Sequence, residues 1–304
     1  METDFDSLDQ VLVFALRKII CSGHEIKPRG QVTREILNFN FCLADPRARL
    51  ILNSAARWSL PLAIGEFCWH SSGSDSVDAI AYYASAWRDT SDDGAHIAES
   101  CYGAKVFADS ASDDQWRAVV NMLKHDINSR RACITLARPL SSLDVNAKDL
   151  SCTTSCQFMV RSGCVHCFVT MRSNDAIWGL PYDVFFFSML QERLALELGC
   201  KLGKYYHQAS SLHLYERHYS RAQRIIEADT PNSASMRPMS DLHLLSHLLQ
   251  SESSIRSGQY EHVETDSLGY WGRFEQVLRD FSASKSATSK ETLRWAKLIS
   301  SHCH

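Results

Sequence analysis

The chain has 304 residues, of which 45% are hydrophobic, 22% charged and 10% aromatic; this composition is typical of globular proteins and excludes fibrous, collagen-like and wholly disordered chains. Its 32 Lys and Arg residues nearly balance 35 Asp and Glu residues, and the formal net charge of −3 is too small for non-specific attraction to nucleic acid or a membrane. The apolar runs are far shorter than the roughly 20 residues that span a bilayer. The N-terminal segment is acidic, whereas a secretory signal is basic. We therefore expect a soluble cytoplasmic protein that holds any anion with a few local side chains.

Apolar spacing and turn residues predict the elements in chain order. The predicted helices are residues 1–20, 60–69, 114–128, 184–198, 242–249 and 271–281. The predicted strands are residues 31–55 with a break at Asp45-Pro46, residues 132–136, and a hairpin of residues 157–160 and 164–171. Strands on both sides of a buried helix indicate the α+β class.

Composition changes after about residue 219, where segments rich in Ser, Thr, Pro and Asn separate helical patterns. We predict a catalytic domain over residues 1–219 and a mainly helical C-terminal extension over residues 220–304 that packs on it.

The chain contains eleven cysteines, an odd number, and lacks a secretory signal, which favours free thiols over a disulfide framework. Most are expected to be small core residues. Cys164 and Cys167 have the spacing of metal ligands, but they lie in a strand pattern without a second ligand pair. No metal site is expected.

Several short motifs follow one another in a definite order. They are Glu66 with Trp69, Tyr102-Gly103, Ser129-Arg130-Arg131, the segment from Cys152 to Phe158, the segment from Arg172 to Asp175, the segment from Gly179 to Asp183, and His213-Leu214-Tyr215. This ordered set resembles the thymidylate synthase family from about Arg29 to His218, with gapless spacing from Cys152 to Tyr215. The resemblance implies a thymidylate synthase-like fold, in which helices surround a mixed β-sheet that forms a homodimer interface.

The resemblance also implies a reaction in which a thiolate adds to C6 of a pyrimidine nucleotide and 5,10-methylenetetrahydrofolate donates one carbon to C5. Cys152 matches the nucleophile. Adding sulfur at C6 makes C5 nucleophilic, and the thiolate requires positive surroundings near neutral pH. Arg172 and the Arg130-Arg131 pair are expected to provide them.

The family resemblance implies a phosphate site made mainly of arginines, whose planar guanidinium groups suit a dianion. Arg172 and Ser173 match the phosphate ligands, and Arg29 is expected to join them. Arg130 and Arg131 are expected to come from the neighbouring subunit, which implies a homodimer. The remaining matches are His213 and Tyr215 to the ribose hydroxyl ligands, Gln157 and Asn174 to the base and sugar pocket, and Asp175, Gly179 and Tyr182 to the pterin-facing segment.

Asp183 stands where thymidylate synthases have Asn, whose amide suits the O4 and N3–H of uracil. Cytosine presents the reverse pattern, an amino donor at N4 and an acceptor at N3. A carboxylate accepts from the amino group and stabilises a proton on N3. Asp183 therefore resembles the cytidylate hydroxymethylase branch, the alternative being sequence drift without a change of substrate.

Glu66 matches the glutamate that organises water and proton transfers, and we expect it to activate water with Tyr102 and Asp183 in the same network. Thr153 replaces the usual His after the nucleophile, which again suits a base other than uracil. The folate-facing tryptophan is expected to be Trp87, although strict spacing would put Arg88 in that place.

The leading hypothesis is transfer of a one-carbon unit to C5 of CMP, with water addition giving 5-hydroxymethyl-CMP and tetrahydrofolate. Overall, the chain is more similar to the CMP hydroxymethylases of nucleoside-antibiotic pathways than to phage dCMP enzymes, and the small Ala176 leaves room for a ribose 2′-OH. The alternatives are a dCMP hydroxymethylase, a dUMP-methylating synthase, and a catalytically retired homologue that binds RNA or a partner. Residues 300–304 are polar, unlike the apolar tail that closes over folate in synthases.

Overall fold

The structure is a computed structural model that describes residues 4–107, 114–144, 146–228, 234–259, 269–285 and 287–300. Its centre is a mixed β-sheet with strand order β1-β3-β8-β6-β5-β4, in which β2 also pairs with β3 and β7 with β8. The strands are β1 (Asp4–Phe5), β2 (His24–Ile26), β3 (Thr33–Leu43), β4 (Cys133–Thr135), β5 (Thr153–Arg161), β6 (Cys164–Met171), β7 (Asn174–Asp175) and β8 (Lys201–Tyr215). The α+β prediction is confirmed.

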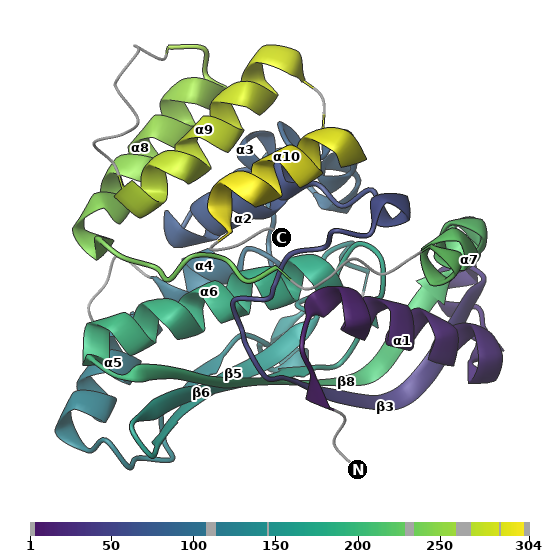
Figure 1. Ribbon diagram of the computed structural model, residues 1–304. Helices are drawn as coiled ribbons and strands as arrows, with labels where there is room; N and C mark the ends of the chain where they lie inside the picture. Colours follow the sequence, from purple (N-terminus) through teal and green to yellow (C-terminus); the bar gives the residue numbers. More distant parts are fainter. Residues whose placement is uncertain are drawn as a thin grey trace.

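Helices stack above this sheet (Figure 1). They are α1 (Leu8–Ser22), α2 (Leu60–Ser71), α3 (Val77–Ala81), α4 (Tyr102–Val106), α5 (Gln115–His125), α6 (Leu180–Leu198), α7 (Tyr219–Glu227), α8 (Leu245–Arg256), α9 (Gly269–Ser284) and α10 (Ser289–Ile299). The buried helix α6 lies on β6 and β8, and α1 lies on β3 and β8. Within the described chain, no helix is both long enough and apolar enough to cross a membrane.

Most predicted element boundaries shift by a few residues, and two of the differences have a clear local cause. Helix α6 begins at Leu180 instead of residue 184, because Pro181 occupies the first turn, where its missing N–H costs nothing. Asp183 therefore lies in the first turn of a helix. The break predicted at Asp45-Pro46 is confirmed, since β3 ends at Leu43 and the Asp45 carbonyl accepts from Ala48 N at 2.9 Å. The strand expected after the break, up to residue 55, is wrong, because no strand forms there.

Strand pairing brings several of the predicted site residues to one end of the sheet. Strands β5 and β6 are antiparallel, so the start of β5 and the end of β6 are neighbours, and Arg172 N donates to Cys152 O at 2.9 Å. Strand β8 runs parallel to β6 and ends at the same side, where Tyr215 pairs with Thr33 at the start of β3. Residues far apart in sequence thus meet at one end of the central strands.

The C-terminal helices α8, α9 and α10 lie over α2 at the top of Figure 1. The rings of Phe67 on α2 and Trp271 on α9 stack at 6.0 Å with an interplanar angle of 7°. Both rings belong to one continuous hydrophobic core that also contains residues of α1 and α6. The division at residues 219 and 220 stays a prediction, and residues 301–304 lie outside the described residues.

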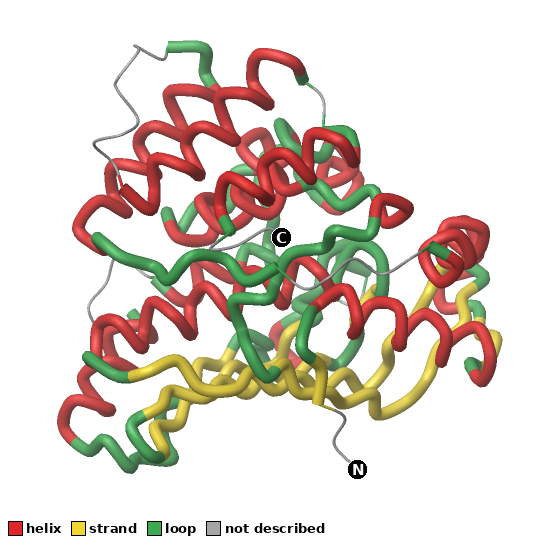
Figure 2. The backbone as a smooth tube through the Cα atoms, in the orientation of Figure 1, coloured by secondary structure: helices red, strands yellow, loops and turns green. Residues whose placement is uncertain are grey.

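The second face of the sheet is not covered by the helices of the described chain (Figure 2). Alternate side chains of the strands point to this face. It carries Leu37, which is 70% exposed, and the stacked rings of Phe168 and Tyr206, whose centroids lie 4.6 Å apart. This is the face on which a homodimer contact is predicted, and the dimer stays a prediction.

Candidate active site

The nucleophile candidate, Cys152, lies immediately before β5, beside the arginine that follows β6. The Arg172 Nη2 atom is 3.9 Å from Cys152 Sγ. Arg172 is held there because Nε donates to Ser151 O and Nη2 to Leu150 O, each at 2.9 Å. The cation is thus fixed against the sulfur by the backbone of the segment that carries it.

Burial nevertheless raises the pKa of the Cys152 thiol to about 11. The charge of Arg172 opposes this rise, while Asp183, Asp149 and Asp175 reinforce it. Among the main influences on the thiol pKa within this chain, Arg172 is the cation that lowers it. Stabilisation of the thiolate by Arg130 and Arg131, which are expected from a second subunit, stays a prediction. In this structure the sulfur holds its proton at neutral pH.

Glu66 on α2 and Asp183 on α6 lie close enough for their charges to interact. Burial raises the pKa of Glu66 to about 8; the charge of Asp183 adds to the rise, and a hydrogen bond from the Trp87 side chain opposes it. Burial likewise raises the pKa of Asp183 to about 7, against a 2.8 Å hydrogen bond from Asn174 Nδ2 to its Oδ2. Two carboxyls whose pKa values lie near neutral pH form a pair suited to general acid and base catalysis.

Tyr102 at the start of α4 lies near both Asp183 and the nucleophile. Its hydroxyl accepts from Thr153 N at 3.3 Å, and both Asp183 and Cys152 act on its pKa, which burial holds well above the usual value. The approach of α4 to α2 requires Gly103, because a Cβ there would lie 1.8 Å from His70 O. The Thr153 hydroxyl is buried and has no hydrogen-bond partner in the described chain.

The predicted ribose and phosphate ligands lie along the ends of β6, β7 and β8. Asp175 pairs with His213 across the parallel strands, and the Ser173 hydroxyl is 3.5 Å from His213 Nδ1. Burial and the charge of Asp175 raise the pKa of Tyr215, against the cations of Arg217 and Arg29. Arg29 therefore lies near Tyr215, at the same end of the central strands.

The folate-facing candidates come from separate parts of the chain. Trp87 is half-buried, contacts Trp69 at 5.6 Å between ring centroids and reaches Glu66. Arg88 is exposed and pairs with Asp78 at 2.6 Å, so Trp87 and not Arg88 meets the carboxyl. The Tyr182 hydroxyl accepts from Ser59 N at 3.1 Å, and Asp175 Oδ1 accepts from Ile177 N and Trp178 N at 2.7 and 3.0 Å.

Three predicted substrate ligands have other partners in the structure. Asn174 is 2% exposed, and its amide binds Asp183 and His207. Gln157 lies on the opposite face of β5 from Cys156 and donates to Arg130 O at 2.7 Å. Ala176 is completely buried, and its amide donates to His213 O at 2.9 Å.

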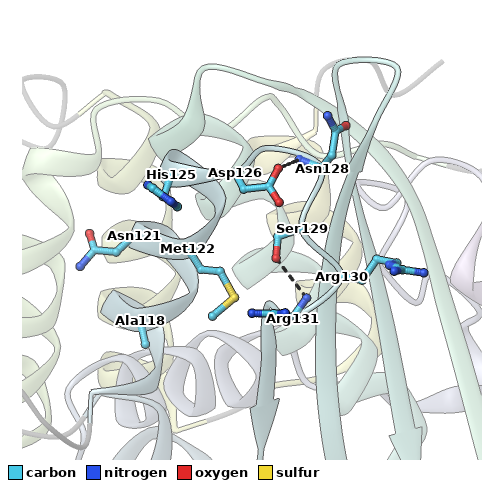
Figure 3. A pocket seen from close by; sticks show the side chains of 9 residues that line it. All are labelled: Ala118, Asn121, Met122, His125, Asp126, Asn128, Ser129, Arg130 and Arg131. Carbon is cyan, nitrogen blue, oxygen red and sulfur yellow. Dashed lines mark hydrogen bonds between the residues drawn. The ribbon is translucent and has the colours of Figure 1, made fainter.

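Arg130 and Arg131 line a separate cavity of about 940 Å³ (Figure 3). Its lining residues are Ala118, Asn121, Met122, His125, Asp126, Asn128, Ser129, Arg130 and Arg131. The two guanidinium groups extend in different directions from the segment after α5, and Arg131 N donates to Ser129 Oγ at 3.2 Å. None of these nine residues is among those that surround Cys152 in this chain, so delivery of the arginines to a neighbouring subunit stays a prediction.

Sequence reasoning missed His70, Arg217, and the pair Tyr205 and His207. His70 lies one helical turn after Glu66, which is a spacing that places both on one face of α2. Its ring stacks on Tyr102 with centroids 5.4 Å apart, and burial lowers its pKa to about 3. Arg217 lies 4.1 Å from the Tyr215 ring, and its place next to the His213-Leu214-Tyr215 motif was the available signal.

Cys164 and Cys167 lie on opposite faces of β6, because they are three positions apart in a strand whose side chains alternate between its two faces. Among the described residues, no group of three or more His, Cys, Asp or Glu side chains is arranged to hold a metal ion.

We expect Glu66→Gln to stabilise the protein at alkaline pH. A glutamate in the unfolded chain ionises around its ordinary pKa of 4.5, whereas folded Glu66 keeps its proton up to about pH 8. Between these values the folded state binds the extra proton, so wild-type stability falls as pH rises, and Gln removes that loss. The melting temperature of the variant should exceed that of the wild type by about 5 °C or more at pH 8.5.

Thermal unfolding at pH 5, 7 and 8.5 measures this difference. The advantage of Glu66→Gln should grow across that series and level off above pH 8. The matched control is Glu25→Gln on the exposed strand β2. A difference for Glu66→Gln that is independent of pH would contradict an elevated pKa.

The comparisons with known proteins agree on one family. The family model described as thymidylate synthase matches residues 13–250 and so extends into α8. A deoxyuridylate hydroxymethyltransferase of Bacillus phage SP01 is 28% identical over 217 residues, 68% of this chain and 56% of that protein. A thymidylate synthase of Buchnera aphidicola subsp. Baizongia pistaciae is 26% identical over 221 residues, 69% of this chain and 81% of that protein. The chain thus spans little more than half the length of the phage relative.

Proposed function

Because the chain belongs to the thymidylate synthase family, we propose that it transfers one carbon from 5,10-methylenetetrahydrofolate to C5 of CMP, giving 5-hydroxymethyl-CMP and tetrahydrofolate. The observation that carries the choice of base is Asp183, a half-buried carboxyl in the first turn of α6 that interacts with Glu66 and Cys152. An asparagine in that place would suit uracil.

Cytosine recognition uses the acceptor capacity of Asp183. The N4 amino group donates to the carboxylate, and a proton on N3 is stabilised by the same group. With a pKa of about 7, Asp183 can either hold or release a proton at neutral pH. Protonation at N3 withdraws electrons from the ring and makes C6 a better acceptor for sulfur.

Cys152 is the proposed nucleophile, and its proton must leave as the substrate binds because the thiol pKa is about 11. Arg172, 3.9 Å from the sulfur, stabilises the thiolate that forms. The addition makes a bond from sulfur to C6, and the electron pair of the C5–C6 double bond becomes available at C5.

Glu66 is the proposed acid and base for water. It holds its proton near neutral pH partly because Asp183 repels its ionised form. Pairing of the Asp183 carboxylate with a protonated base weakens that repulsion, so Glu66 can then accept a proton from water. When C5 has lost its proton and tetrahydrofolate has left, the transferred carbon remains on C5 as a methylene group. Water, instead of hydride, adds to this methylene, and loss of the Cys152 sulfur from C6 restores the C5–C6 double bond of the hydroxymethyl product.

The residues around Glu66 fit a pterin. Asp175 Oδ2 has no hydrogen bond from the described chain and can accept from pterin N–H groups, while Trp87 offers a half-exposed ring. Methylenetetrahydrofolate, when bound, supplies the one-carbon unit. Tyr182 and Gly179 would form the rest of the pterin site. The Tyr182 hydroxyl accepts from Ser59 N, so its own hydrogen remains available for donation.

For the nucleotide, we propose that Arg172, Arg29 and Ser173 hold the phosphate, and that His213 and Tyr215 hold the ribose. Arg130 and Arg131 would come from a second subunit that packs on the uncovered sheet face, which carries the exposed Leu37 and the stacked rings of Phe168 and Tyr206. Since Ala176 is completely buried and its amide donates to the His213 carbonyl, we propose that any effect of its small size on the ribose 2′-OH acts through that histidine.

A second candidate substrate is dUMP, because the phage relative is named for deoxyuridylate. Release of tritium from 5-tritiated CMP, dCMP and dUMP with methylenetetrahydrofolate tests both. We expect the largest kcat/KM with CMP and formation of tetrahydrofolate. Exchange from dUMP alone would overturn the cytosine assignment, and formation of dihydrofolate would indicate methylation.

A further inference from the structure

A chain of buried hydrogen bonds ends on Asp183. Asn174 Nδ2 donates to Asp183 Oδ2 at 2.8 Å, and Asn174 Oδ1 is 3.1 Å from His207 Nε2. His207 Nδ1 is in turn 3.0 Å from the Tyr205 hydroxyl. Tyr205 and His207 are alternate residues of β8 and therefore point to the same face, toward α6.

This relay, Tyr205, His207 and Asn174, is almost completely removed from solvent, at 0%, 2% and 2% exposure. The His207 ring lies against Phe41 with centroids 5.1 Å apart. A Cβ at Gly179 would lie 2.8 Å from Asn174 Nδ2, so the turn before α6 closes tightly over the amide. Polar atoms in such a place must satisfy one another, because water does not reach them.

The relay has one favourable direction. Because the Asn174 amide gives its donor end to Asp183, its oxygen must accept, so His207 carries its proton on Nε2 and accepts at Nδ1 from the Tyr205 hydroxyl. Burial lowers the pKa of His207 to about 3, so the ring is neutral, with one nitrogen that donates and one that accepts. In the reverse direction the Tyr205 hydrogen would have no acceptor in the described chain, and an oxygen of Asn174 would face the Asp183 carboxylate.

We propose that Tyr205, His207 and Asn174 are positioning residues that make Asp183 a hydrogen-bond acceptor toward the base and thereby select an amino-pyrimidine. The inference rests on the proposed function for its substrate, but the relay itself is a property of the protein alone. Asp183 Oδ2 is occupied by Asn174, whereas Oδ1 has no hydrogen bond from the described chain and is available to the N4 amino group. A donor held against Oδ2 also favours the ionised form, which repels O4 of uracil.

The first test is independent of activity. Carboxyl carbon NMR of protein labelled with ¹³C-aspartate follows Asp183, whose signal is assigned by its loss in Asp183→Asn. Tyr205→Phe removes one oxygen from the core and frees the His207 tautomer, so the Asp183 midpoint should rise by roughly half a unit or more. The matched control is Tyr270→Phe, which deletes a buried hydroxyl that contacts only Met189 Sδ, at 3.8 Å, among the bonds of the described chain.

The second test measures selectivity. Tyr205→Phe and His207→Phe should reduce the ratio of kcat/KM for CMP over dUMP by about tenfold, the effect of one charge-assisted hydrogen bond. His207→Gln, which retains a donor, should restore much of it. An unchanged Asp183 midpoint in Tyr205→Phe overturns the proposal. An equal loss of kcat/KM for CMP and for dUMP would also overturn it.

The two tests separate this proposal from the proposed function. If the wild type releases no tritium from any pyrimidine nucleotide, the proposed function fails, and the NMR midpoint still decides whether the relay acts on Asp183.

Discussion

Replacing Cys152 with Ala is expected to abolish release of tritium from 5-tritiated CMP, with a loss on the order of 10⁴-fold or more. Exchange at C5 requires addition at C6, and Cys152 is the sulfur that Arg172 approaches at 3.9 Å at the end of the sheet. The release rate with methylenetetrahydrofolate measures the loss. Binding of CMP, followed by calorimetry, should survive the substitution, since the phosphate and ribose ligands remain.

Cys21→Ala, which changes an exposed thiol at the end of α1, is the control and should retain full activity. An active Cys152→Ala protein would mean that another group attacks the base. A wild type without exchange would instead favour the retired homologue.

The same variant tests whether subunits share arginines. Equal mixtures of inactive Cys152→Ala and inactive Arg131→Ala chains should regain about one quarter of wild-type activity, because half of the dimers are mixed and one of their two sites is intact. No recovery after confirmed subunit exchange would mean that Arg131 serves its own chain.

Replacing Asp183 with Asn is expected to transfer the activity from cytosine to uracil. The introduced amide can accept from Asn174 Nδ2 with its oxygen and present its donor to O4 of uracil. The kcat/KM for tritium release from CMP should fall by roughly 10²-fold or more, because a cytosine amino group would then face a donor. Release from dUMP should rise.

Asp78→Asn is the control, since Asp78 is exposed and pairs only with Arg88 among the described ion pairs. A loss on CMP without any gain on dUMP would show that Asp183 acts chiefly as an acid or base. A variant that still prefers CMP would assign base selection elsewhere.

Local sequence patterns predicted much of the fold. Apolar residues at helical spacing indicated α1 and α5, and a nearly continuous apolar run indicated the buried helix α6. The turn at Arg161-Ser162-Gly163 indicated the β5–β6 hairpin. These structures depend largely on contacts between near neighbours. The long strand β8 and the strand order were not predicted. They depend on pairing between segments as distant as Thr33 and Tyr215, and no local pattern records which strand lies beside which.

Some features of the candidate site were likewise predictable from sequence, and others depend on the tertiary structure. The resemblance of the ordered motifs to the thymidylate synthase family was enough to single out Cys152, Arg172, Glu66 and Asp183, because motif identity and spacing are properties of the chain. Their protonation is a property of the packed molecule, since burial and a neighbouring charge hold Glu66 protonated to about pH 8 and Cys152 to about pH 11. The partners of Asp183 likewise appear only once β7 and β8 pair and bring Asn174, His207 and Tyr205 into one buried line.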